Sequence, residues 1–534
     1  MISPTGLPAI LTAIRAGAIG HAERLFREGG HDRQPENAAA QAVLARLLAE
    51  RARTLPPTLR PAAFAESAAA YARADAQVPQ LYTRINSATM TLLAGDVAGA
   101  QVMAEKVLSW LEAEPVIRET PFMIEACRAE AHLVAGRLDA ARSVLVGAVA
   151  MAPEAYEDHA AARRQFQMIC HARDIDDSWL EAFAPPSTLH YAGHLGVAAE
   201  PGTRLLAEID GALAADRVGF AFGALAAGAD LTIAERVLER GGELHVVLPL
   251  REEAFLQQSV RPYGADWERR FIAVRDAAAS WTETAQDTGA YEPLASHLAA
   301  DVAMGAAVRH SRSLGGEAVQ LVILDDADGP LGAGIHTARE ARRWSSMGRT
   351  SRSLRVPRSA PVAASGTRKA PEGRPERRLA AMLQIDFVGL ADLDEAQLAD
   401  AVADVLLPFR AALSLIPVRP SVTLPCGNSR IMAFADPESA FAFARAVSDI
   451  PVVPFGLRIA GHYGLAHWLS DPEALIGRPV DQLATIAAVA FPGAITVSEA
   501  FASALCLATG DEVYAEPLGD AGPLRLYALR VAGR

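Results

Sequence analysis

The residues best suited to binding chemistry are small ones, and they gather between residues 217 and 250. A loop bracketed by Gly223 and Gly228 joins a short apolar segment, Arg217–Phe222, to a predicted helix, Ala229–Arg240. Backbone amides and the positive end of the helix dipole meet at such a helix start, and glycine lets a phosphate approach closely. The loop is therefore a candidate anion site. Small residues also serve ordinary packing between a strand and a helix, so both interpretations stay open on the glycines alone.

The elements around this loop predict a parallel sheet. The predicted helix carries apolar residues at helical spacing and ends at Gly241-Gly242, and Leu244–Leu248 is typical of a buried parallel strand. An upstream strand ends at Gly193-His194, and sequential strands of this kind usually lie side by side. We therefore expect His194 and the loop at the same edge of the sheet, where such folds bind ligands.

With these motifs, residues 189–343 resemble the SLOG superfamily of Rossmann-like domains, which bind nucleotides and nucleotide-derived signals. The resemblance is carried by Gly193-His194, Gly228-Ala229-Asp230, Ala234-Glu235 and the strand end Val246–Pro249. The Pro-Gly-Gly-x-Gly-Thr loop of the hydrolytic members is absent, which favours ligand binding over base-releasing hydrolysis. At the helix start, Asp230 is better placed to cap free amides than to contact a ligand. The resemblance implies these ligand-facing residues: Gly193, His194, Gly223, Ala224, Gly228, Ala229, Asp230 and Glu235.

Length and composition indicate several globular domains. A chain of 534 residues exceeds what one core supports, so we expect about three domains. The net charge of −13 argues against general nucleic-acid binding. The four cysteines form no CxxC pair, which fits a reducing compartment and no zinc site. The sequence has neither a convincing signal peptide nor an apolar run long enough to span a bilayer, so we expect a cytoplasmic protein.

Residues 1–180 have helical periodicity and almost no strand signal. The segments Ile85–Ala100 and Ala126–Ala141 look alike, and their central glycines, Gly95 and Gly136, are 41 residues apart (136 − 95). Residues 16–22 are a weaker third copy. The pattern resembles tetratricopeptide-type helical hairpins, although the spacing exceeds the usual period and a generic helical bundle stays open. Either version predicts a module that binds a protein partner.

Residues 187–344 are assigned to the Rossmann-like domain, with a mainly parallel sheet. Another clear strand, Gly316–Asp325, closes with Asp325-Asp326, where either a ligand site or, as we prefer, a solvated loop is expected. Residues 345–378 are rich in Ser, Pro, Ala and Arg without a hydrophobic period. This composition predicts a disordered basic linker.

Residues 379–534 show an α+β order that resembles the ferredoxin-like homology domain of class III adenylate/guanylate cyclases. The resemblance is carried by Asp386–Gly389, Asp436-Pro437, Arg458–Gly464, Ile476-Gly477 and Pro492-Gly493 with Ser498–Ala500. It implies dimerisation, because these domains form their sites between two chains. The apolar content of Leu457–Ile459 and Leu483–Val489 is taken as a surface for such a homodimer.

The same resemblance implies that the catalytic residues have been lost. Asp386 stands at the first metal position, but the second holds Asn428, and hard divalent cations prefer anionic oxygen. The transition-state positions carry no arginine, and an arginine there stabilises a transferring phosphate by several kcal/mol. We therefore expect an inactive cyclase-like domain without a cofactor, with Mg²⁺ or Mn²⁺ relevant only if it is active. The degenerate positions are Leu424 and Arg478 for purine selection, and Asp481 and Thr485 for the transition state.

Three functions follow as alternatives. The preferred one is a signalling protein that senses a nucleotide-derived small molecule and uses the degenerate cyclase-like domain for dimerisation or regulation. The second is a divergent cyclase that makes a cyclic nucleotide from ATP or GTP. The third is a helical-repeat scaffold without a small-molecule ligand.

Overall fold

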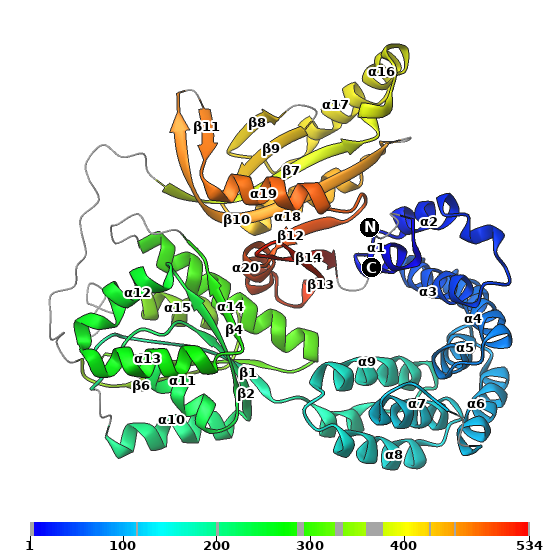
Figure 1. Ribbon diagram of the computed structural model, residues 1–534, viewed down its shortest axis with the longest axis horizontal. Helices are drawn as coiled ribbons and strands as arrows, with labels where there is room; N and C mark the ends of the chain where they lie inside the picture. The colour runs from blue at the N-terminus through cyan, green and yellow to red at the C-terminus, as the bar shows by residue number, and fades with distance from the viewer. Residues whose placement is uncertain are drawn as a thin grey trace. The chain divides into compact units, whose positions relative to one another are not determined.

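The computed structural model describes residues 5–113, 116–198, 202–285, 293–325, 335–358, 377–426, 429–452, 455–471 and 473–531. The chain divides into two compact units, one built mainly from Met1–Pro185 and one from Pro186–Arg312 and Gly316–Ala532 (Figure 1). The first unit is helical and the second contains two sheets. Among the described residues, no helix combines the length and apolarity that crossing a membrane requires.

Pairs of helices joined by tight glycine corners build the helical unit. Gly17, Gly95 and Gly136 have φ angles of +76°, +91° and +81°, which only glycine adopts without strain. At each corner the glycine N–H donates to the carbonyl three residues back, and the next N–H to the carbonyl five back. The predicted helical hairpins are therefore present at all three places. The helices are α1 Leu7–Arg15, α2 Ile19–Glu28, α3 Ala38–Thr54, α4 Arg60–Gln77, α5 Leu81–Leu93, α6 Val97–Glu112, α7 Pro121–Val134, α8 Leu138–Met151 and α9 Tyr156–Ala172.

The first sheet is parallel throughout, in the order β4-β3-β2-β1-β5-β6. Its strands are β1 Ser187–Gly193, β2 Val218–Gly223, β3 Glu243–Leu248, β4 Ser280–Glu283, β5 Ala318–Leu324 and β6 Ser351–Arg355. His190 on β1 lies opposite Phe222 on β2, so the predicted adjacency of these two strands is confirmed. The chain runs from β1 outward to β4, then crosses to β5 on the other side of β1. This change of direction is the switch point at which open α/β sheets bind ligands.

Within the described ranges, six helices accompany the parallel sheet. They are α10 Thr203–Ala215, α11 Ala229–Glu239, α12 Glu252–Ser259, α13 Ala265–Ala277, α14 Pro293–Leu314 and α15 Ile335–Ser346. The expectation of an unstructured linker from residue 345 is wrong for Ser351–Arg355, because β6 pairs in register with β5. Residues 359–376 of that expected linker lie outside the described residues.

The second sheet is mixed, in the order β13-β14-β12-β10-β7-β9-β8, with β11 paired to β10. Only the β10–β12 pair is parallel among the described pairings of this sheet. The strands are β7 Arg377–Val388, β8 Val422–Cys426, β9 Ser429–Phe434, β10 Gly456–Ser470, β11 Glu473–Ile476, β12 Ile495–Ser498, β13 Val513–Ala521 and β14 Leu524–Val531. The helices are α16 Glu395–Ala401, α17 Leu407–Leu415, α18 Pro437–Ser448, α19 Arg478–Val489 and α20 Glu499–Thr509.

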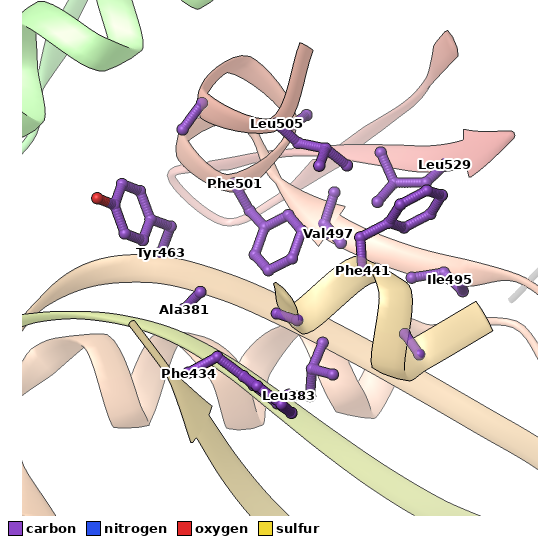
Figure 2. Packing of buried hydrophobic residues seen from close by; sticks show 14 of the residues in the cluster. Ala381, Leu383, Phe434, Phe441, Tyr463, Ile495, Val497, Phe501, Leu505 and Leu529 are labelled. Carbon is purple, nitrogen blue, oxygen red and sulfur yellow. The ribbon is translucent and has the colours of Figure 1, made fainter. Parts of the chain in front are cut away.

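Successive side chains of β7 point to opposite faces of the second sheet, and each face has its own hydrophobic cluster. Figure 2 shows Phe441 of α18 and Phe501 of α20 packed together with Leu383 of β7 and Val497 of β12. The neighbouring β7 residue Met382 packs on the opposite face, in the cluster that contains α19. Side chains that alternate in this way fix the register of the strand.

Several of the apolar residues proposed as a dimer surface lie inside this core, whereas Val489, at the end of the second segment, is 48% exposed. Leu457 and Ile459 are 9% and 2% exposed, and Leu483 and Ile486 are fully buried. Their partners are other residues of the same chain, in the clusters on the two sheet faces. The apolar character of these four buried residues is therefore explained by folding, and they give no support to a homodimer.

Candidate functional site

A cavity of about 250 Å³ opens at the carboxyl ends of β1, β2 and β3. Strand ends form its floor, and α14 and α15 supply other walls. This is the edge at which the topology predicts a ligand. We call it the crevice, and its lining includes Tyr191, Gly193, His194, Gly223, Ala224, Asp230, Val247, Phe255, Ala299, Ala303, His336, Glu340 and Arg358.

The glycines at this edge are explained by close packing inside the domain. A Cβ on Gly193 would lie 2.1 Å from the Cβ of Ala229, and one on Gly223 would lie 2.6 Å from Cζ of Tyr191. Gly228 has a φ of +116°, and a Cβ there would approach the Gly196 amide nitrogen to 2.9 Å. The packing interpretation therefore accounts for all three glycines, and a larger residue at position 228 would strain the backbone itself.

Two amides of the small-residue loop, those of Ala226 and Ala227, already have partners within the chain. Asp230 accepts hydrogen bonds from the Gly193 amide at 2.8 Å and the Ala226 amide at 3.3 Å. The Ala227 amide donates to the Ser259 carbonyl at 2.9 Å. The chain's own carboxylate thus occupies the place that a phosphate was expected to take. The Ala226 and Ala227 amides are therefore not open to a phosphate, and the expected phosphate site at this loop stays a prediction.

Two other predicted ligand residues have structural partners. The ring of His194 lines the crevice, but its Nδ1 and Nε2 lie 2.9 Å from the carbonyl oxygens of Leu195 and Val356. Glu235 forms an ion pair with Arg270 of α13 and is absent from the crevice lining, so its expected ligand-facing position is wrong. Asp325 is buried, and its carboxylate lies 3.3 Å from Nε of Arg358. The expectation that Asp325 belongs to a solvated loop is therefore wrong. Asp326 lies outside the described residues.

The crevice also holds a buried polar cluster that the sequence analysis missed. Tyr191 is fully buried, and its hydroxyl has no hydrogen-bond partner among the described residues. His190 Nε2 lies 3.6 Å from a carboxylate oxygen of Glu340, and the amide nitrogen of Gln320 lies 3.1 Å from His190 Nδ1. The His190 ring stacks on Trp344, with centroids 5.8 Å apart. These partners come from β1, β5 and α15, so no local motif in the sequence marks them.

Burial decides the protonation of this cluster. It raises the pKa of Asp230 to about 7, against the opposing effect of the two amides that bind its carboxylate. Burial likewise raises the pKa of Glu340 to about 8, with a further increase from Asp230 and an opposing effect of Arg339. Burial lowers the pKa of His190 to about 3. Near neutral pH the histidine is therefore uncharged, and Glu340 is mostly protonated.

In the second sheet, Asp386 lies on β7 opposite Ser429 and Arg458. Its Oδ1 accepts a hydrogen bond from the Gln384 side-chain amide at 3.0 Å. Asn428, the second metal position, lies outside the described residues. Across the described ranges, no group of three or more His, Cys, Asp or Glu side chains could hold a metal.

The other degenerate positions fall on β8 and α19. Leu424 lies on β8 opposite Ile431. Arg478 begins α19, and Asp481 lies in the first turn of that helix. Thr485 donates its hydroxyl to the Asp481 carbonyl at 3.0 Å, so this side chain is bonded within its own helix.

Comparisons with known proteins find similar solved structures for the cyclase-like part of the chain. No family model matches the chain, and no curated protein matches it. Similar solved structures include the adenylyl cyclase CyaB from P. aeruginosa, at 14% identity over 30% of this chain and 97% of that one, with a TM-score of 0.25. An adenylate/guanylate cyclase/hydrolase from Silicibacter pomeroyi matches at 20% identity over 29% of this chain and 99% of that one, with a TM-score of 0.24. These neighbours are class III cyclase domains, and they match only the cyclase-like part of the chain.

Proposed function

We propose that this chain is a nucleotide-responsive regulatory protein whose parallel-sheet domain binds a nucleotide-derived ligand in the crevice. The observation that carries the proposal is Tyr191, which lines the cavity and whose buried hydroxyl lacks a partner among the described residues. Buried polar groups in native proteins are nearly always hydrogen-bonded, so such a group points to a missing partner. Mostly apolar walls with a few convergent polar groups are typical of small-molecule sites.

Ligand-dependent stabilisation of the full chain tests this proposal. ATP, GTP, NAD and ADP-ribose are titrated, and thermal unfolding is followed together with calorimetric binding. A ligand at 100 times its dissociation constant stabilises the folded state by about 2.7 kcal/mol, which is a readily measured shift. Absence of stabilisation and of binding heat for every nucleotide at millimolar concentration would refute the proposal.

The cyclase-like domain serves as a regulatory rather than a catalytic module in this proposal. Its support is chemical: Asp481 places an anion where the family uses a neutral amide, and Asp386 already accepts a hydrogen bond from Gln384. Purified full chain with ATP or GTP and either Mg²⁺ or Mn²⁺ is expected to form no cyclic nucleotide. Product that accumulates with the wild-type chain and disappears in Asp386→Ala would favour the divergent cyclase instead.

Assembly belongs to the same proposal. The solved neighbours are described as both monomeric and dimeric guanylyl cyclase domains, and we propose a homodimer through the cyclase-like domain. The helical unit is proposed to bind a protein partner. Sedimentation velocity of the full chain at micromolar concentration is expected to give a dimer, and a concentration-independent monomer would contradict it.

A further inference from the structure

We infer that the crevice receives the nucleoside end of its ligand and leaves the phosphates outside, next to Arg358. This inference rests on the proposed function and assigns an orientation to the ligand of that site. The reverse orientation, with phosphate at the small-residue loop, is the one that the sequence pattern alone suggests.

The first argument is the charge of the inner wall. Tyr191 and Asp230 are 0% and 6% exposed, and Glu340 is mostly buried beside them. Asp230 and Glu340 are close enough for the one carboxyl to disfavour the charge of the other. A phosphate placed here would add negative charge beside Asp230, whose carboxyl already accepts from the Gly193 and Ala226 amides, in a buried wall that also disfavours charge on Glu340. The Gly193, Ala226 and Ala227 amides cannot compensate, because Asp230 and the Ser259 carbonyl already accept hydrogen bonds from them.

The second argument is the hydrogen-bonding character of the same wall. The carboxyl oxygens of Asp230 and Glu340 accept hydrogen bonds, the protonated Glu340 carboxyl can also donate one, and the Tyr191 hydroxyl both donates and accepts. A ribose or a nucleobase offers hydroxyl or amino donors together with acceptors, whereas a phosphate offers mainly acceptors. The Tyr191 hydroxyl, which has no partner in the described structure, would gain one from such a group. Val247, Phe255 and Ala303 supply apolar surface suited to the flat faces of a base.

The third argument is size. Ligand pockets usually begin at about 300 Å³, and the crevice holds about 250 Å³. The cavity therefore encloses part of a nucleotide, and the remainder stays at the opening.

Arg358 is the residue that would contact the phosphates, which lie outside the crevice in this orientation. Its side chain is 25% exposed, compared with 13% for Glu340, and it lines the crevice. Its Nε lies 3.3 Å from the Asp325 carboxylate, which orients the guanidinium. A guanidinium carries five N–H donors, so it can bind a phosphate while it keeps this contact.

Calorimetry with the full chain tests the orientation. Adenosine and guanosine, their 5′-monophosphates and 5′-diphosphates, 2′,3′-dideoxyadenosine, and inorganic phosphate are compared. A nucleoside is expected to bind and to displace its own nucleotides, whereas 10 mM phosphate displaces neither. Tyr191→Phe keeps the ring that packs over Gly223, and it should weaken nucleoside and nucleotide equally, by about 2- to 10-fold. Arg358→Gln should weaken only the nucleotides.

The outcomes separate the inference from the proposed function. If nucleotides bind, but phosphate competes with them and Tyr191→Phe leaves nucleoside affinity unchanged, the orientation is refuted and nucleotide sensing stands. If neither nucleosides nor nucleotides bind the wild-type chain, both are refuted. Circular dichroism and thermal unfolding of each variant show that it is folded before its affinity is interpreted.

Discussion

Replacing Glu340 by glutamine is expected to stabilise the protein increasingly as the pH rises. Glutamine keeps the size of the side chain and removes only its charge. Glu340 lies 13% exposed on α15, with His190 at 3.6 Å, and His190 is uncharged above pH 4 and so supplies no counter-charge. The charged carboxylate is therefore an unfavourable feature of the folded state, and the variant lacks it.

The direction and size of this stability difference follow from the raised pKa of Glu340, which is about 8 in the folded chain against an ordinary value of 4.5. Because the folded state holds this proton more tightly, Glu340 favours folding at low pH, and this contribution is lost between about pH 4.5 and pH 8. One pKa unit corresponds to about 1.4 kcal/mol. The wild-type chain should therefore lose about 4 kcal/mol relative to Glu340→Gln between pH 5 and pH 9.

Urea unfolding of both chains from pH 5 to pH 9, followed by tryptophan fluorescence, measures this difference. Titrating groups that do not interact with Glu340 are common to the two proteins and cancel in the comparison, whereas Asp230 is coupled to Glu340 and contributes to the measured difference. Glu473→Gln, at an exposed position of β11, is the matched control and should show a difference below about 0.5 kcal/mol at every pH. A Glu340→Gln difference that stays constant with pH would show that the carboxylate is charged and solvated in the folded protein, and would refute the reasoning.

Two further predictions concern packing. Gly193→Ala should destabilise the chain by about 1–3 kcal/mol, because the added Cβ would lie 2.1 Å from the Cβ of Ala229. Gly211→Ala, in open space within α10, is the control and should stabilise the chain by about 0.5–1 kcal/mol. The urea unfolding midpoints of the two variants measure these changes. In the helical unit, Glu130 accepts hydrogen bonds from Thr89 and Gln165. Glu130→Ala should lower stability by about 1–3 kcal/mol, measured by thermal unfolding, and an unchanged midpoint would contradict it.

Local signals in the sequence predicted the parts of the fold that depend on neighbouring residues. The corners at Gly17, Gly95 and Gly136 need a positive φ angle, and the residues on both sides of each glycine reveal the two helices. The adjacency of β1 and β2 follows in the same way, because two strands joined by one helix usually pair.

What the sequence did not reveal depends on contacts between distant segments. Glu340 meets His190 across 150 positions of the chain, and nothing near either residue marks the pair. The composition of β6 predicts a linker, because its serines and arginines carry no hydrophobic period. An edge strand is held chiefly by backbone hydrogen bonds, so its composition can be polar while its pairing with β5 remains regular.

Asp230 shows most clearly how a binding pattern can be correct in geometry and misleading in chemistry. Glycines, small residues and a helix start do form a nest of amides at the expected edge of the sheet, and the nest does hold an anion. That anion is the chain's own carboxylate, bonded to the Gly193 and Ala226 amides. Because this carboxyl and Glu340 together form the inner wall, the chemistry that the nest offers to a ligand changes from donors for phosphate to acceptors for hydroxyl and amino groups.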